Sequence, residues 1–218
     1  MLRALFSKTD DAVYISHLDL MRVFQRAFAR ADLHLTHTQG YNPRPSVSIA
    51  MPLSVGVSSR CELLDFELDG QEIPCDEICR RLGDKLIPGV RVLEVYENGR
   101  KLRDLILLRC AVTLEYDAGV KDGYADAIRD LFAQPSVIVT KKGKNGPTQQ
   151  DIIPMIRRMD VMAGEREITL EALICCQNPS LNPMQLHEAI CVHLPELKPD
   201  FARCQRLEIY DGNENVFR

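Results

Sequence analysis

The chain has 218 residues, of which 45% are hydrophobic and 27% charged, the composition of an ordinary globular protein that folds around its own core. Its formal net charge of −4 argues against nucleic-acid binding over the whole surface, and no apolar run approaches the roughly 20 residues that a membrane helix needs. Residues 1–60 carry seven Lys/Arg and four Asp/Glu, a net +3 that leaves −7 for the rest. We therefore expect a cytoplasmic protein without membrane contact, with room for a local anion-binding region in the N-terminal quarter.

The first half alternates strand and helix patterns. A helix is predicted at 16–32, where Ser16 is a suitable N-cap and Asp19, three residues on, forms a variant of the capping box. Its apolar stripe consists of Leu20, Phe24, Ala27, Phe28 and Ala31. Further elements are predicted as strands at 2–8, 33–38 (an edge strand), 46–57, 61–69 and 90–97, and a helix at 75–86. This order is β-α-β-β-α-β with one extra or split strand.

The second half repeats that order less cleanly. It contains predicted strands at 105–117, 136–142, 167–177 and 204–211, and predicted helices at 124–134 and 184–194. The segment 141–160 interrupts the repeat, and we interpret it as a basic loop followed by a short helix capped by Asp151. The sequence thus predicts an α+β fold of two tandem ferredoxin-like (split β-α-β) halves with antiparallel sheets. The predicted domains are 1–100 and 101–218, the second with a basic insertion at 141–160.

The eight cysteines show no spacing typical of a metal site. Only Cys75 and Cys79 form a short pair, and their i, i+4 spacing places both on one face of a helix without forming a CxxC knuckle. Cys110, Cys175 and Cys191 lie in apolar segments, where cysteine behaves as a small buried hydrophobe. We therefore predict reduced thiols and no metal ligands.

The first predicted helix carries a basic ridge. Arg22, Arg26 and Arg30 recur at spacing four on the face opposite the apolar stripe, and Asp19 lies three residues before Arg22. Such a ridge is either a solvated face with one Asp–Arg pair or a binding surface for phosphates. Taken alone it favours the solvated face, and the lack of a second acid along it strengthens the case for phosphates. His17, the first helical residue, either makes local hydrogen bonds or contacts an anion beside the helix N-terminus. A catalytic pair with Asp19 is not expected, because side chains two apart on a helix diverge.

The loop "QGYNPRP", residues 39–45, holds several specialised residues. Gly40 permits a positive φ, Asn42 forms turns, and the prolines on either side of Arg44 fix it between two rigid units. Arg44 would then bind a phosphate while Tyr41 stacks on a base. The alternative is a rigid turn with Tyr41 folded over the core, and the sequence leaves both interpretations open.

The run "KKGKNG" contributes Lys141, Lys142 and Lys144, either as part of a solvated flexible loop or as a phosphate clamp from the second half. No Walker loop, GxGxxG, CxxxCxxC, HExxH or GxSxG motif occurs anywhere in the chain. We therefore expect no cofactor and name no catalytic residue.

Three blocks carry a family resemblance: "ISHLDLMRVFQRAFARADL", "THTQGYNPRPSVSIAMPLSVGVSSRCELLDFEL" and "KKGKNG…DIIPMI". Together they resemble the radical SAM-linked family of bacterial proteins, also described as the DUF2344 domain of unknown function, in its stand-alone form. Members of that family occur alone or as a C-terminal extension of cobalamin-binding-type radical SAM proteins. Because this chain lacks the three-cysteine cluster motif of such enzymes, the resemblance implies that a radical SAM protein is its partner.

Three hypotheses for function follow. The first is a non-catalytic accessory module that binds RNA, or presents a substrate, to a radical SAM enzyme in RNA or ribosome modification. The second is an RNA-modifying or RNA-cleaving enzyme that uses His17, Asp19 and Arg44, and the third is a protein-interaction subunit that docks through a sheet edge or a helix face. For the first hypothesis the binding residues are His17, Arg22, Arg26, Arg30, Tyr41, Asn42, Arg44, Lys141, Lys142 and Lys144.

Overall fold

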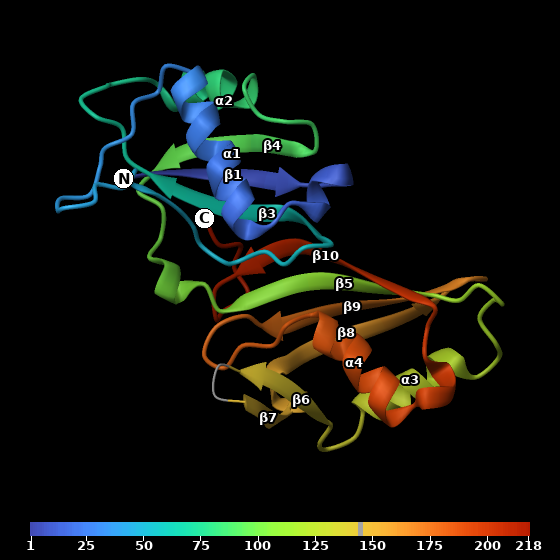
Figure 1. The fold of residues 1–218 in the computed structure, drawn as a ribbon. Coiled ribbons are helices and arrows are strands. Elements are labelled where there is room, and N and C mark those ends of the chain that lie inside the picture. Colours follow the sequence, from blue (N-terminus) through green and yellow to red (C-terminus); the bar gives the residue numbers. More distant parts are fainter. Residues whose placement is uncertain (144–145) are drawn as a thin grey trace. The chain divides into compact units, whose positions relative to one another are not determined.

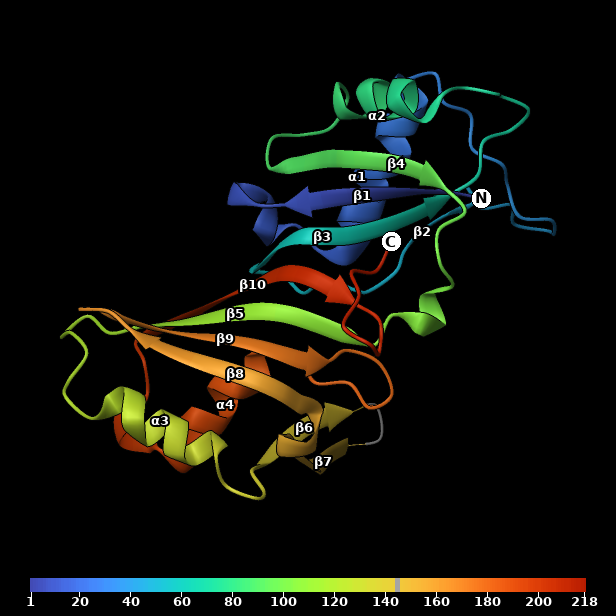
Figure 2. The ribbon, with the colours of Figure 1, turned by 180° about the vertical axis from the view of Figure 1, so that it is seen from behind.

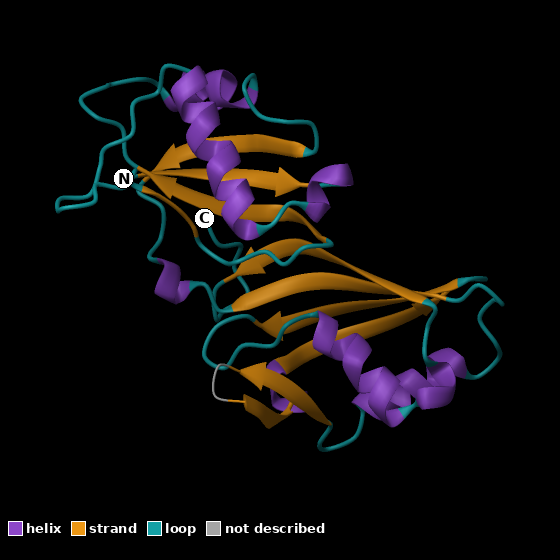
Figure 3. Cartoon of the chain, viewed as in Figure 1, coloured by secondary structure: helices purple, strands orange, loops and turns teal. Residues whose placement is uncertain are grey.

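The computed structural model describes residues 1–143 and 146–218, and for Lys142 and Gly143 it describes the backbone alone. The chain divides into two compact units (Figure 1). Unit 1 comprises Met1–Leu102 together with Arg218, and unit 2 comprises Arg103–Phe217. Each unit combines helices with antiparallel strands, so the chain has an α+β fold (Figure 3).

Unit 1 is a split β-α-β unit. Its elements are β1 (Leu2–Lys8), α1 (His17–Arg30), β2 (Val47–Ile49), β3 (Val57–Phe66), α2 (Cys75–Gly83) and β4 (Val90–Glu97). Strands β4, β1 and β3 are neighbours in that order, β2 pairs with β3, and every pairing is antiparallel. In terms of chain order the strands run 4-1-3-2, which is the ferredoxin-like arrangement.

The core of unit 1 lies between its sheet and its helices, which cover one face of β4, β1 and β3 (Figure 1). The rings of Phe6 and Phe24 meet edge to face with centroids 4.8 Å apart, and those of Phe28 and Phe66 lie 4.9 Å apart. Every member of the apolar stripe predicted for the first helix is buried. Hydrophobic burial therefore fixes which face of α1 points away from the sheet.

Both ends of α1 are closed by local hydrogen bonds. The Ser16 hydroxyl accepts from the Asp19 backbone N–H at 3.2 Å, as predicted for an N-cap, and donates to the Asp19 carboxylate at 2.7 Å. At the other end Asp32 adopts a left-handed φ of +56°, and the Leu33 N–H donates to the Phe28 carbonyl at 3.0 Å. These bonds form a Schellman motif, which directs the chain back beside the helix.

Unit 1 also buries an ion pair. The Arg3 guanidinium donates to both carboxylate oxygens of Asp65 and to the Arg100 carbonyl, and both side chains are more than nine-tenths buried. Burial lowers the pKa of Arg3, but the hydrogen bond and the charge of Asp65 outweigh it and leave that pKa above its usual value. The pair therefore stays charged within the unit.

Unit 2 repeats the same strand order with a larger sheet. Its elements are β5 (Leu107–Glu115), α3 (Tyr124–Phe132), β6 (Ile138–Gly143), β7 (Gly146–Asp151), β8 (Ile156–Ala163), β9 (Glu167–Cys175), α4 (Met184–His193) and β10 (Phe201–Tyr210). Strands β10, β5, β9 and β8 are antiparallel neighbours in that order, and α3 and α4 lie on one face of them (Figure 2). This order is again 4-1-3-2, with the β6–β7 hairpin inserted between the first helix and the second strand.

Two predicted strands of unit 1 are much reduced. Residues 33–38 form no regular strand, and only the isolated bridges Leu35–Leu68 and His37–Pro45 mark their pairing. Of the strand predicted at 46–57, only Val47–Ile49 pairs with β3 before the chain leaves the sheet near Pro52, which has no N–H to donate to a ladder.

The prediction of a loop and a short helix at 141–160 is wrong for most of this segment, which is largely strand. It contains the end of β6, the strand β7, a one-turn 3-10 helix at Ile153–Met155 and most of β8. The Asp151 carboxylate accepts from the Ile153 N–H at 3.2 Å, at the start of this turn. The chain then enters the sheet, so the second sheet strand of unit 2 is β8 and not the predicted 136–142.

Candidate nucleic-acid interface

A cleft opens on unit 1 between α1 and the segment that follows it. Its volume of about 420 Å³ lies within the range of small-ligand pockets. We call it the α1 cleft; it is lined by Gln25, Phe28 and Ala29 from α1, by Leu33, His34, Leu35 and His37 from the following segment, and by Pro45 and Asp69. The cleft therefore joins the C-terminal half of the helix that carries the arginines to the base of the 39–45 loop.

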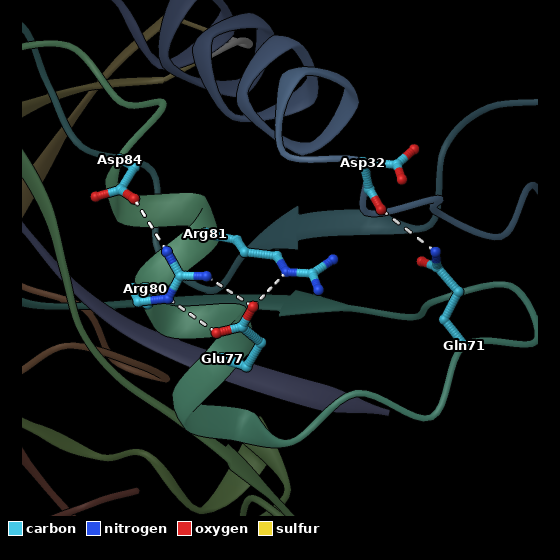
Figure 4. A network of polar contacts seen from close by, with 6 residues as sticks. All are labelled: Asp32, Gln71, Glu77, Arg80, Arg81 and Asp84. Atoms are coloured by element: carbon cyan, nitrogen blue, oxygen red, sulfur yellow. Dashed lines mark hydrogen bonds and ion pairs between the residues drawn. The ribbon is translucent and has the colours of Figure 1, made fainter.

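Gln71 fixes the wall of this cleft. Its side-chain oxygen accepts from the His34 backbone N–H at 2.9 Å, and its amide nitrogen donates to the Asp32 carbonyl at 3.3 Å (Figure 4). The Asp69 backbone N–H donates to the His34 carbonyl at 2.8 Å. The turn after α1 and the segment after β3 are thus held together by three hydrogen bonds.

The 39–45 loop is closed at its base. The Thr38 N–H donates to the Arg44 carbonyl at 2.9 Å, and the Arg44 N–H donates to the Thr38 hydroxyl at 3.0 Å. Gly40 at the tip has a φ of +138°, a backbone conformation that favours glycine. Tyr41 is fully exposed, so the alternative in which it folds over the core is wrong. Asn42 and Arg44 are exposed beside it.

The arginines of α1 differ in their pairing. Arg22 donates to the Asp19 carboxylate at 2.7 Å, and hydrogen bonds from Ser16 and then Arg22 lower the pKa of Asp19. Arg26 and Arg30 are exposed, and no carboxylate among the described residues lies within ion-pair distance of either. These two guanidinium groups are therefore free to bind an anion.

The arginines of α2 are neutralised in comparison. Arg80 donates to Glu77 and Asp84, and Arg81 donates to Glu77 at 2.7 Å (Figure 4). The hydrogen bonds from Arg80, and then those from Arg81, lower the pKa of Glu77 to about 2. Of the two helices, α1 thus presents the uncompensated positive charge.

His17 lies apart from the α1 cleft. It begins α1, whereas Ala29 is twelve residues further along, roughly 18 Å at the rise of a helix. His17 is half-buried, and its Nδ1 is shielded without a hydrogen-bond partner among the described residues. The Asp19 carboxylate is engaged by Ser16 and Arg22, so the structure gives no His17–Asp19 pair.

The lysines of the basic run belong to unit 2. Lys141 and Lys142 lie on β6, opposite Thr148 and Pro147 of β7, and Lys141 is half-buried. Lys144 and the side chain of Lys142 lie outside the described residues.

Several cleft residues were not predicted as binding residues, notably Gln25, His34, His37 and Asp69. One signal was present in the sequence: Gln25 and Ala29 lie four residues apart at the margin of the apolar stripe, where a polar and a small side chain leave space on a helix. Asp69 could not be found this way, because contacts between distant parts of the chain bring it to the cleft: the pairing of Leu35 with Leu68 and the bond from the Asp69 N–H to the His34 carbonyl.

None of the eight cysteines forms a disulfide, and the described part of the chain contains no group of three or more His, Cys, Asp or Glu that could hold a metal ion. No helix in that part is both long enough and apolar enough to cross a membrane.

Fold and sequence together place the chain among α+β proteins built from two tandem split β-α-β units. The chain belongs to the DUF2344 family, described as uncharacterized proteins conserved in bacteria, whose sequence profile matches residues 1–183. No curated protein matches it in sequence.

Among solved structures, a chain of a Cbf5–Nop10–Gar1 complex is 8% identical over 94% of this chain and 48% of its own length, with a TM-score of 0.50. A chain of the archaeal box H/ACA sRNP Nop10–Cbf5 complex is 8% identical over 93% of this chain and 46% of its own length, with a TM-score of 0.47. The present chain thus spans less than half the length of these structures, and the likeness to the first is one of fold.

Proposed function

We propose that this protein is a non-catalytic accessory module that binds RNA through unit 1. The observation that carries the proposal is the α1 cleft, whose lining joins the arginine-bearing half of α1 to the base of the loop that presents Tyr41 and Arg44. Unit 1 thereby carries the guanidinium groups of Arg26 and Arg30, unpaired within the described part of the chain, together with the exposed side chains of Arg44 and Tyr41.

These groups suit an unpaired RNA strand. Guanidinium groups bind phosphate oxygens in bidentate fashion, and an exposed tyrosine stacks on a base with a gain of about 1–3 kcal/mol. The sequence carries its net positive charge in residues 1–60 and a net negative charge beyond them, which favours binding at this one region. Arg22 contributes less than Arg26 or Arg30, because Asp19 already pairs with it.

The module presents its RNA to a partner in this proposal. The family resemblance supports a radical SAM protein as that partner, acting in RNA or ribosome modification, and the chain itself lacks the cysteine cluster which that chemistry requires. Lys141, Lys142 and Lys144 provide a second phosphate contact from unit 2, and His17 a further contact at the start of α1.

Fluorescence anisotropy with labelled single-stranded RNA and transfer RNA tests the proposal. We expect tight binding at low salt, and Arg26→Ala, Arg30→Ala and Arg44→Ala should each weaken it. Each substitution should also reduce the slope of log affinity against log salt by about 0.7, because one phosphate contact on a single strand is lost. The matched control is Arg91→Ala, an exposed arginine on β4 without an ion pair among the described residues, which should leave both quantities unchanged.

Two outcomes would contradict the proposal. One is the absence of binding to single-stranded, transfer and ribosomal RNA at low salt. The other is a loss of RNA affinity in Arg91→Ala as large as that in the three arginine variants. If a radical SAM protein were captured equally by the wild type and the arginine variants, and no RNA bound, the protein-interaction hypothesis would be favoured instead.

A further inference from the structure

We propose that the α1 cleft binds one unpaired guanine base, which gives the RNA-binding surface a base preference. This inference rests on the proposed function and concerns the part of the ligand that the arginines do not contact.

Most of the residues that line the cleft are apolar. Phe28, Ala29, Leu33, Leu35 and Pro45 supply apolar surface, and the small Ala29 leaves space on the helix side. The volume of about 420 Å³ accommodates a nucleobase with part of its sugar. The Schellman turn and the hydrogen bonds of Gln71 hold the opposing wall in place before any ligand arrives.

The polar lining selects among the bases. The carboxylate of Asp69, the amide of Gln25 and the imidazole of His37 border the cleft, and none of these side chains has a hydrogen-bond partner among the described residues. An ionised carboxylate only accepts hydrogen bonds. Guanine presents two adjacent donors, N1–H and the N2 amino group, whereas adenine, cytosine and uracil each place an acceptor beside a donor. Asp69 can therefore pair with guanine through both oxygens.

The charge pattern separates base from phosphate. A carboxylate in the cleft repels phosphate, so this cavity does not suit the RNA backbone. Arg26 and Arg30 lie on the exposed face of the helix whose Gln25 and Ala29 line the cleft. A strand that places guanine against Asp69 therefore has cationic side chains of α1 within its reach.

Free guanine nucleotides present the same base edge, so the test includes both sources. The probes are decamers of uridine with one central guanosine, adenosine or inosine, a uridine-only decamer, and guanosine monophosphate. We expect the guanosine decamer to bind about tenfold or more tightly than the adenosine decamer, the discrimination of a good bidentate pair. Inosine should fall between them, because it keeps N1–H and lacks the amino group.

Asp69→Asn should abolish the guanosine preference, and the affinity for the uridine-only decamer should not fall, because the substitution also removes a negative charge that repels phosphate. The matched control is Glu72→Gln, an exposed acid on the same segment outside the cleft lining, which should keep the preference. Ala29→Leu, which fills the cleft from the helix side, should also remove the preference. Thermal unfolding of each variant checks that the fold is retained.

The outcomes separate the two proposals. If the uridine-only decamer binds and guanosine adds nothing, the guanine site is wrong and RNA binding stands. If no decamer binds, RNA binding is wrong, and guanosine monophosphate then tests the cleft. Binding of this nucleotide to the wild type that is lost in Asp69→Asn supports a nucleotide site. No binding of the nucleotide to the wild type overturns that site. If guanosine monophosphate binds as tightly as the guanosine decamer, the ligand is the free nucleotide.

Discussion

Units 1 and 2 share the strand order 4-1-3-2 and differ most in one connection, that between the first helix and the second strand. In unit 1 this connection is the irregular segment that walls the α1 cleft and carries the 39–45 loop, and the strand that follows has only three residues. In unit 2 it is the β6–β7 hairpin, and the strand that follows has eight residues. Because β2 and β8 each pair with a single strand among the described residues, this connection can vary while the other three strands of each unit keep their pairing.

The units also differ in where they place opposite charges. Unit 1 buries the Arg3–Asp65 pair, whereas in unit 2 Arg203 pairs with Glu115 and Glu167 through side chains that are at least one-third exposed. A buried pair costs much to break because it leaves one charge without its partner, and an exposed pair costs little. The following predictions use such differences to test the comparison, beginning with the largest effect.

Asp65→Ala should destabilise the protein by about 3–5 kcal/mol, because the buried Arg3 guanidinium loses both of its carboxylate bonds. Urea unfolding measures this loss. The matched exposed substitution in unit 2, Glu115→Ala, should cost at most about 1 kcal/mol. Similar losses in both variants would show that the two units do not differ in their dependence on ion pairs.

Asp151→Ala should cost about 2 kcal/mol, because this carboxylate accepts from the backbone N–H groups of Val137 and Ile153 at the two ends of the hairpin. Its counterpart in the connection of unit 1, Thr38→Val, removes one exposed hydrogen bond to the Arg44 N–H and should cost less. Amide hydrogen exchange should show faster exchange at Val137 and Ile153 in the first variant and at Arg44 in the second. Unchanged exchange at these amides would contradict the proposed anchoring.

Gln71→Ala should cost about 1 kcal/mol, because two hydrogen bonds that hold the wall of the α1 cleft are lost. Thermal unfolding measures the loss, with Gln149→Ala as control, since Gln149 is exposed on β7 in unit 2. If the two glutamine substitutions have equal effects, the bonds of Gln71 do not stabilise the cleft.

The smallest effect concerns pH. Hydrogen bonds from Arg80 and then Arg81 lower the pKa of Glu77 from its ordinary 4.5 to about 2. A carboxyl whose pKa is lower in the folded state stabilises the protein above pH 4.5, and this contribution disappears as the pH falls towards 2. The melting temperature of the wild type should therefore exceed that of Glu77→Gln at neutral pH, and the difference should vanish near pH 2. A difference that persists unchanged to pH 2 would refute the ion pair as its cause.

Local sequence signals predicted the elements whose cause is local. The N-cap at Ser16 and the apolar stripe of α1 depend on residues within one or two turns, so α1 could be located directly. The strand β8 was missed because a register shift between Ile156 and Arg158 interrupts the alternation that identifies a strand. The run "KKGKNG" at residues 141–146, which lies in the β6–β7 hairpin before β8, has the composition of a loop.

The candidate site was predicted only in part. The exposed face of α1 follows from helical periodicity. The restricted backbone around Arg44 follows from the fixed φ of the prolines on either side of it. The α1 cleft depends on contacts between residues far apart in the chain, such as the bond between Gln71 and His34. Such pairings are tertiary, and no spacing within the sequence encodes them.

The closed base of the 39–45 loop has a kinetic consequence. Prolines at 43 and 45 and the paired hydrogen bonds between Thr38 and Arg44 restrict the loop before any partner arrives, so little chain entropy remains to be lost when a ligand binds. The loop therefore does not have to rearrange before a ligand binds. Its association rate is then set by diffusional encounter, and oppositely charged partners should associate faster as the ionic strength falls.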